Sequence, residues 1–205
     1  ALITALNSSS AAMSRVAAET IGRLGDAAFG APQLLQSRSW NQTGDRALEH
    51  ALIYALIEMN DPIGTAKGLA NPFARRGALI ALDQMDDGNL KPEQVMPFLN
   101  SDDPRLKETA FWIVSRHPEW GAALAGYFKE RLGASRFSET DRMELPAQLA
   151  RFAGSVPMQE VLADALRHSA SDEARRIILQ AIAASKLKQA PDSWRAEVVR
   201  ILKDG

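Results

Sequence analysis

Residues 76–85 read RGALIALDQM, and the apolar spacing within this stretch decides the fold. Ala78 and Leu82 are four residues apart and Met85 follows three residues later, so all three lie on one face of an α-helix. Five other ten-residue segments carry aliphatic or alanine residues at the first two of these places. The six segments begin at Arg15, His50, Arg76, Glu108, Met143 and Arg176. Their starts are 26 to 35 residues apart, which is a length typical of a repeated helical hairpin.

A proline marks the second helix that we expect in each hairpin. Proline has no N–H to leave unpaired and its φ is already helical, so it suits the first turn of a helix. The six prolines are Pro32, Pro62, Pro92, Pro118, Pro157 and Pro191. Serine, aspartate or asparagine precedes several first-helix segments as an N-cap, and no segment alternates apolar and polar residues as a strand does. The sequence therefore predicts an all-α fold.

The composition excludes several classes of protein. Hydrophobic residues make up 46% of the chain, too many for a disordered protein, yet no apolar run approaches the roughly 18 residues needed to cross a bilayer. Lys and Arg total 24 against 25 Asp and Glu, so no overall positive field favours nucleic acid. Cysteine is absent, which removes disulfides and cysteine-ligated zinc. We expect a soluble segment without membrane insertion, without nucleic-acid binding and without a targeting signal of its own, cut from within a longer polypeptide.

Two stretches combine a capped start, a basic residue and an Ala/Leu stripe: SRVAAETIGRLGD (14–26) and NPFARRGALIALDQM (71–85). They resemble HEAT or HEAT-like, armadillo-type repeats, and the resemblance extends over residues 9–204. It implies a right-handed α-α superhelix of about six helical hairpins in a single domain, residues 1–205. The expected units span approximately residues 9–40, 41–70, 71–100, 101–134, 138–169 and 170–205.

A narrower resemblance is carried by ALEHALIYALIEMNDP (47–62) and DDPRLKETAFWIVSRHPEWGAALAGYFKERL (102–132). These stretches are similar to the helical-repeat segment of PVC-type haem-binding bacterial proteins. Those are exported proteins that join a glucose-dehydrogenase-like β-propeller, helical repeats and a cytochrome c-type domain with a CxxCH motif. The resemblance implies a periplasmic or cell-envelope parent protein with haem c in another domain. Without cysteine, this segment has no CxxCH and no cofactor site of its own.

Arginine and tryptophan provide the candidate interaction residues. Arg15, Arg76 and Arg176 occupy the same place in three segments, so they form either a broken basic stripe or solvated arginines that bond to neighbouring units. Trp112 lies two residues beyond the apolar position Ala110 and either packs against the adjoining hairpin or serves as an exposed anchor. The other two tryptophans are Trp40, in the polar stretch SRSWNQTGD, and Trp194, near the end of the chain. We expect both to contact other domains.

His117 is the one histidine in an unusual setting, directly before Pro118 and close to Trp120. We interpret these three residues as a structural corner, in which the His117 ring fills a half-buried gap and bonds to the backbone. The chain has no HExxH motif, no GxSxG motif and no glycine-rich phosphate loop. The sequence therefore predicts no catalytic residue and no metal ligand.

The sequence favours a non-catalytic scaffold or protein-interaction module. Its expected partners are neighbouring domains of the same polypeptide or another protein. Two alternatives stay open: a nucleic-acid-binding solenoid similar to the HEAT-like DNA glycosylases, and a haem- or bilin-handling protein similar to the HEAT-like bilin lyases. The first would need a strongly basic face, which the net charge of −1 disfavours.

Overall fold

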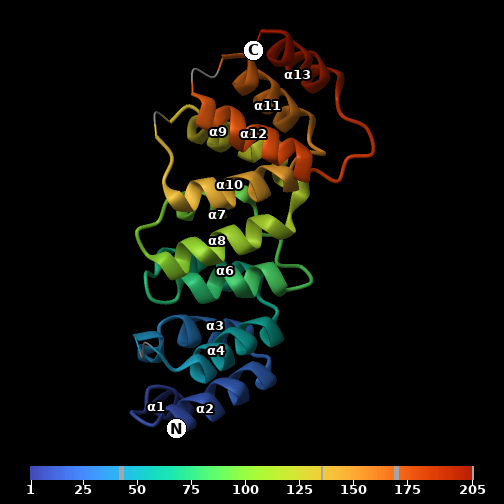
Figure 1. Ribbon diagram of the computed structural model, residues 1–205. Helices are drawn as coiled ribbons and strands as arrows, with labels where there is room; N and C mark the ends of the chain where they lie inside the picture. Colours follow the sequence, from blue (N-terminus) through green and yellow to red (C-terminus); the bar gives the residue numbers. More distant parts are fainter. Residues whose placement is uncertain (42–43, 135, 169–170, 205) are drawn as a thin grey trace. The chain divides into compact units, whose positions relative to one another are not determined.

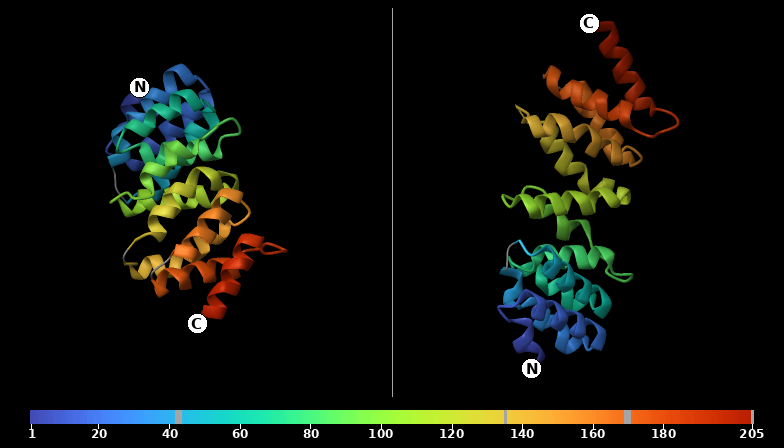
Figure 2. Two further views of the ribbon diagram at one scale, coloured as in Figure 1. Left: turned by 90° about the horizontal axis from the view of Figure 1, so that it is seen from above. Right: turned by 60° about the horizontal axis from the view of Figure 1, so that its bottom comes forward.

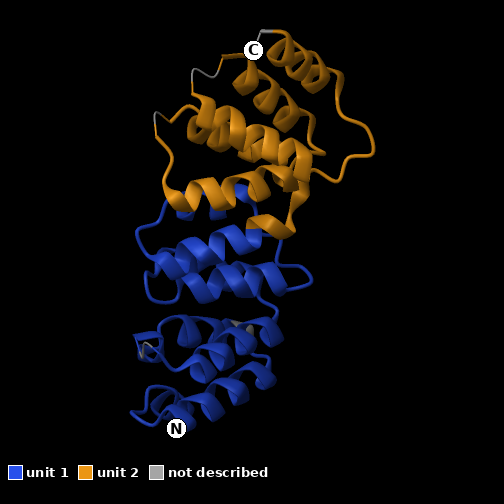
Figure 3. Ribbon diagram, viewed as in Figure 1, with its two compact units in different colours: residues 1–113 blue, residues 114–205 orange. Residues whose placement is uncertain are grey.

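The computed structural model describes residues 1–41, 44–134, 136–168 and 171–204, and within these ranges the chain is all-helical, without a β-strand (Figure 1). The predicted all-α fold is confirmed. The chain divides into two compact units, Ala1–Ile113 and Val114–Gly205, with the division inside one helix (Figure 3). Each unit is described by itself.

Unit 1 holds the first part of the helical array. Its α-helices are α1 (Leu2–Leu6), α2 (Ala11–Leu24), α3 (Ala27–Leu35), α4 (Arg46–Met59), α5 (Pro62–Ala66), α6 (Arg75–Gln84), α7 (Pro92–Val95) and α8, which begins here (Pro104–Arg116). Three short 3₁₀ helices connect them: η1 (Arg38–Asn41), η2 (Lys67–Ala70) and η3 (Met96–Phe98). Along the chain, α2 packs on α4 and α4 on α6, while α3 packs on α5. The blue to green helices of Figure 2 show these neighbours side by side.

Unit 2 repeats the same kind of packing. After the 3₁₀ helix η4 (Pro118–Trp120), its helices are α9 (Gly121–Leu132), α10 (Glu139–Arg151), α11 (Val156–His168), α12 (Asp172–Ala184) and α13 (Asp192–Asp204). Helix α10 packs on α12, and α11 packs on both α9 and α13. Every second helix along the chain is therefore a neighbour within the unit.

The apolar stripes seen in the sequence form the core. All six residues of the first stripe position are at most 2% exposed; they are Ala17, Leu52, Ala78, Ala110, Leu145 and Ile178. Four residues further on, five of the six are buried and Ile182 is half-buried. At the third place, Met59, Met85 and Phe152 are buried, His117 and Ser185 are half-buried, and Leu24 of the first segment is 65% exposed. There α2 ends, and Gly25 leaves the helix with a φ of 67° that glycine adopts without strain.

Helix starts follow the caps more closely than the prolines. Ser10, Asp45, Ser138 and Ser171 each accept a hydrogen bond from a backbone N–H in the first turn of α2, α4, α10 and α12. Pro62, Pro92 and Pro118 stand at the first position of α5, α7 and η4, as predicted. The prediction was wrong for Pro32, which lies inside α3 because Asp26 caps that helix earlier. Pro191 directly precedes α13.

Within the described ranges, no helix is both long enough and apolar enough to span a bilayer.

Candidate functional site

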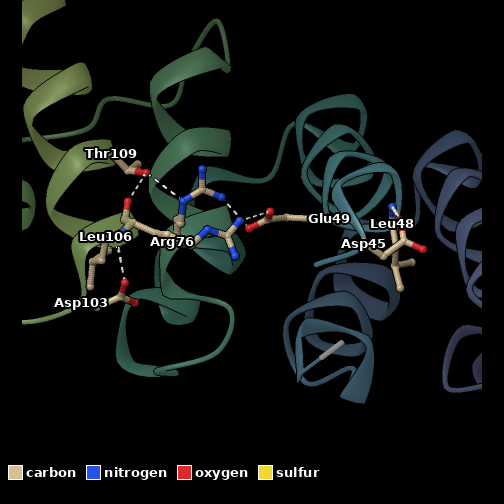
Figure 4. Close-up of polar contacts among 8 residues, drawn as sticks. Asp45, Leu48, Glu49, Arg76, Asp103, Leu106 and Thr109 are labelled. Atoms are coloured by element: carbon tan, nitrogen blue, oxygen red, sulfur yellow. Dashed lines mark hydrogen bonds and ion pairs between the residues drawn. The ribbon is translucent and has the colours of Figure 1, made fainter. Parts of the chain in front are cut away.

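The candidate site is the exposed face of α4, α6 and α8 in unit 1, and Arg76 lies at its centre (Figure 4). From α6, Arg76 donates through Nη1 to Glu49 Oε1 on α4 at 2.5 Å and through Nε to Thr109 Oγ1 on α8 at 2.9 Å. Its side chain is 29% exposed and that of Glu49 is 23% exposed, so the pair is partly shielded from water. Arg76 thus joins three successive first helices. It has the neighbour-bonding role that was one of its two interpretations.

Two further contacts hold this network in place. Arg105 on α8 donates to the second oxygen of Glu49 at 2.6 Å, so one carboxylate receives two guanidinium groups. Thr109, which is 4% exposed, donates its hydroxyl to the carbonyl of Arg105 at 2.8 Å. Asp45 caps α4 through the Leu48 N–H at 2.9 Å and thereby fixes the turn that carries Glu49. Glu49, Arg76, Arg105 and Thr109 thus form one connected network across α4, α6 and α8.

Replacing Arg76 by alanine is expected to lower the free energy of unfolding by about 1–2 kcal/mol, because the partly shielded Glu49 and Thr109 lose a charged donor. Arg176→Ala is the matched control, since Arg176 has the equivalent place in its segment but is exposed and makes no hydrogen bond or ion pair with another described residue. Urea unfolding followed by circular dichroism measures both. Equal, negligible effects of the two substitutions would contradict the assigned role of Arg76.

An exposed apolar row crosses the same face. Tyr54 on α4 is 46% exposed, Trp112 on α8 is 41% exposed, and Ile80 on α6 is half-buried. All three occupy the fifth place of their segments. Helix α4 packs on α6, and the Arg76–Thr109 hydrogen bond joins α6 to α8. We call Tyr54, Ile80 and Trp112 the apolar row. Sequence analysis named only Trp112; the shared fifth place was the signal that would have found the other two.

The three arginines of the predicted basic stripe have different surroundings. Arg15 on α2 is half-buried at the mouth of a groove in unit 1, Arg76 is paired with Glu49, and Arg176 lies on α12 in unit 2. Between Arg15 and Arg76, the same place holds His50 on α4, whose ring stacks on Tyr54 with ring centroids 6.3 Å apart. Because Arg76 is paired with Glu49 and His50 stands at the place between it and Arg15, this place does not carry a continuous run of arginines in unit 1.

The two tryptophans that we expected at contact surfaces with other domains differ in burial. Trp194 is 1% exposed and donates its Nε1–H to the carbonyl of Gln159 at 2.9 Å, so it is a core residue of unit 2. Trp40 is half-buried in η1, donates to the carbonyl of Leu34 at 2.7 Å, and lies against Gly77, where a Cβ would come within 2.3 Å of its ring. The expectation for Trp194 was therefore wrong, because the Gln159 carbonyl, 35 residues away in the sequence, holds its indole in the core. Trp40 stays partly exposed, and its contact with another domain stays a prediction.

His117 is half-buried at the corner before Pro118, and its ring stacks on Trp120 at 4.1 Å between centroids, within 8° of parallel. Its Nδ1 lies 2.6 Å from Glu119 Oε1, so a carboxylate is one partner of the ring. The side chain does not cap η4. Stacking on Trp120 and the contact with Glu119 hold the ring as part of the corner. Among the described residues, no group of three or more His, Asp or Glu side chains is arranged as metal ligands.

Glu197 on α13 is the most buried carboxylate of unit 2. Its side chain is 7% exposed and accepts from Arg200 Nε at 2.9 Å and from Arg167 Nε at 2.7 Å. Hydrogen bonds from Arg200 and then Arg167 lower the pKa of Glu197 below its ordinary value. The two arginines tie α13 to the end of α11.

The lowered pKa predicts that Glu197 contributes to the free energy of unfolding at neutral pH and not in acid. Because the folded pKa is lowered, Glu197 stabilises the folded chain above the ordinary carboxyl range, and this stabilisation is lost as the pH falls below about 4.5 through the folded pKa. Glu197→Gln should therefore reduce the loss of unfolding free energy between neutral and acid pH, and Arg200→Gln should act in the same direction. Urea unfolding at a series of pH values measures the slopes. Identical slopes for Glu197→Gln and the natural chain would refute the assignment.

No protein-family model matches this sequence, and no curated protein matches it significantly.

Proposed function

We propose that the chain is a HEAT-like α-α superhelix that acts as a non-catalytic protein-interaction module. Three features support the repeat architecture: the 26- to 35-residue period of the segments, the burial of their shared stripe positions, and the serial packing of alternate helices within each unit. Stability in such an array comes from nearest-neighbour interfaces, and its outer rows of side chains serve as recognition surfaces.

The apolar row is the single observation that carries the interaction function. Two aromatic side chains, Tyr54 and Trp112, are more than two-fifths exposed in the second and fourth segments, and Ile80 has the same place in the segment between them. Aromatic residues contribute much of the binding energy of protein interfaces. Exposed apolar residues that are scattered singly over a surface would not recur at the same place of successive segments. The network of Glu49, Arg76 and Arg105 lies on the same three helices as the row and links them by ion pairs. An apolar row with charged groups on the same helices suits a protein partner.

We further propose that this module belongs to a large exported bacterial redox protein and holds its neighbouring domains, or another protein, on the apolar row. The similarity of residues 47–62 and 102–132 to PVC-type haem-binding proteins supports this setting and the periplasmic or cell-envelope location. Haem c would then be carried by another domain. The mass and haem content of the native polypeptide, isolated from its source cells, test this setting: a polypeptide of this length without haem would contradict it.

Hydroxyl-radical footprinting tests the interaction surface. The isolated 205-residue chain and the native polypeptide with its bound partners are labelled in parallel, and labelling is read residue by residue. We expect Tyr54 and Trp112 to be labelled in the isolated chain and protected in the native assembly. Ile63 on α5, which is 79% exposed, is the control and should keep its labelling. Undiminished labelling of Tyr54 and Trp112 in the assembly would refute the proposed surface.

A further inference from the structure

A groove of about 520 Å³ lies between α2 and α4 in unit 1, directly beside the apolar row. One wall is the face of α2 that carries Arg15, Glu19 and Arg23, which follow one another at intervals of four residues. The floor is formed by Ala47 and Ala51 on α4. Because these two side chains are short, the surface is hollowed here although α2 and α4 pack closely on each other. The volume is in the range of known ligand sites.

The opposite wall is aromatic. His50 and Tyr54 stand one turn apart on α4, and their rings are stacked within 7° of parallel. Tyr54 is also the first residue of the apolar row, so the groove and the row form one continuous surface of unit 1. A flat ring pair at the side of a groove favours an apolar or aromatic side chain of a ligand.

The two guanidinium groups that line this groove do not bond to other described residues of the chain. Arg76 is bonded to Glu49 and Thr109, whereas Arg15 and Arg23 make no hydrogen bond or ion pair with any residue the structure describes. Glu19 between them is likewise unpaired within the described part of the chain. The groove therefore presents positive charge at two ends and a carboxylate at its middle. Free guanidinium groups bind carboxylates in a bidentate manner.

The spacing of the charges defines the ligand. Eight residues of α-helix separate Arg15 from Arg23, which is roughly 12 Å along α2 at 1.5 Å per residue. In an extended peptide, residues i and i+4 are separated by roughly 13 Å and point to the same side, as does residue i+2 between them. Two acidic side chains four residues apart thus match the two arginines. Glu19 disfavours a third carboxylate at the middle position, where the His50 and Tyr54 rings favour an aromatic side chain.

We propose that the groove between α2 and α4 binds an extended peptide segment with the pattern acidic–any–aromatic–any–acidic. Its two carboxylates pair with Arg15 and Arg23, and its aromatic residue lies against His50 and Tyr54. This inference rests on the proposed protein-interaction function and adds the chemistry of the partner segment. A nucleic acid is disfavoured because a run of phosphates would place negative charge against Glu19.

Fluorescence anisotropy of the full 205-residue chain with a labelled peptide Glu-Gly-Trp-Gly-Glu tests the proposal. The double variant Arg15→Gln/Arg23→Gln should weaken binding by at least about tenfold at low salt, because two charge-assisted contacts are lost. Arg151→Gln/Arg176→Gln is the matched control: it removes the same charge from two exposed arginines on the first helices α10 and α12 of unit 2. The control variant should bind the acidic peptide as tightly as the natural chain does. The uncharged peptide Gln-Gly-Trp-Gly-Gln should bind to the natural chain as weakly as the acidic peptide binds to Arg15→Gln/Arg23→Gln.

Three outcomes would overturn the proposal: no peptide binding by the natural chain, equal losses in the two double variants, or tighter binding of a thymidine oligonucleotide than of the acidic peptide. Equal losses would mean that net charge alone attracts the peptide. Failure here is distinguishable from failure of the interaction function, because footprinting of Trp112 does not depend on the arginines. Protection of Trp112 without peptide binding would reject the groove and retain the apolar row.

Discussion

Trp194→Ala is expected to lower the free energy of unfolding of unit 2 by about 3–5 kcal/mol, the largest effect of any single truncation that we predict. Trp194 is 1% exposed and is the largest fully buried side chain. Its removal leaves a cavity between α13 and α11 and leaves the Gln159 carbonyl without the indole N–H that it accepts at 2.9 Å. Both losses act on the packing of the last helix.

Trp112→Ala provides the control, because the same chemical change at a side chain that is 41% exposed should cost much less. Urea unfolding followed by far-ultraviolet circular dichroism gives the free energies, and hydrogen exchange of amides in α11 and α13 shows where the loss falls. Equal destabilisation by the two variants would contradict the assignment of Trp194 to the core. Faster exchange confined to unit 1 would contradict it as well.

Gly22→Val is expected to lower the free energy of unfolding by about 2–3 kcal/mol, because α2 must separate from α4. A Cβ at Gly22 would lie 2.8 Å from the Ala55 Cα and 3.1 Å from its carbonyl oxygen. These are backbone atoms, so no side-chain rotation relieves the overlap. The substitution also alters the groove between the two helices, and it should weaken binding of the acidic peptide together with stability.

Gly126→Val is the matched control for this substitution. Gly126 is also inside a helix, α9, but a Cβ there meets no atom within 4 Å. Valine has a slightly higher helix propensity than glycine, so the change should stay within about 0.5 kcal/mol of the natural chain. Thermal or urea unfolding of both variants measures the difference. A cost at Gly126 as large as that at Gly22 would show that helix propensity, rather than the close approach of α2 and α4, explains the result.

The helices and their buried stripes were predictable because they depend on spacing within about one ten-residue segment. Ala78 and Leu82 are on one helical face whatever the rest of the chain does, and both are buried. Helix starts were less predictable where two signals competed, as at α3, where the Asp26 cap precedes Pro32 by six residues. The Asp26 cap determines where α3 begins, because its side chain accepts a hydrogen bond from an N–H group that would otherwise be unpaired. A proline only lacks an N–H group and satisfies none.

The surface residues were harder to predict because their partners are distant in sequence. Glu49 and Arg76 are 27 residues apart, and only the packing of α4 on α6 brings them together. Trp194 was misjudged for the same reason: its acceptor, Gln159, is 35 residues away. The apolar row, by contrast, repeats at one place in three segments, so aligning exposed as well as buried positions would have revealed Tyr54 and Ile80.

Site-specific photo-cross-linking tests the interaction function most directly. A photoreactive phenylalanine analogue replaces Trp112 in the native polypeptide in its source cells, and a second strain carries it at Ile63 on α5 as the control. Binding on the apolar row predicts a discrete cross-link from position 112 to one protein or to another domain of the same polypeptide, and none from position 63. Equal cross-linking from the two positions, a cross-link to nucleic acid, or none from position 112 would contradict it.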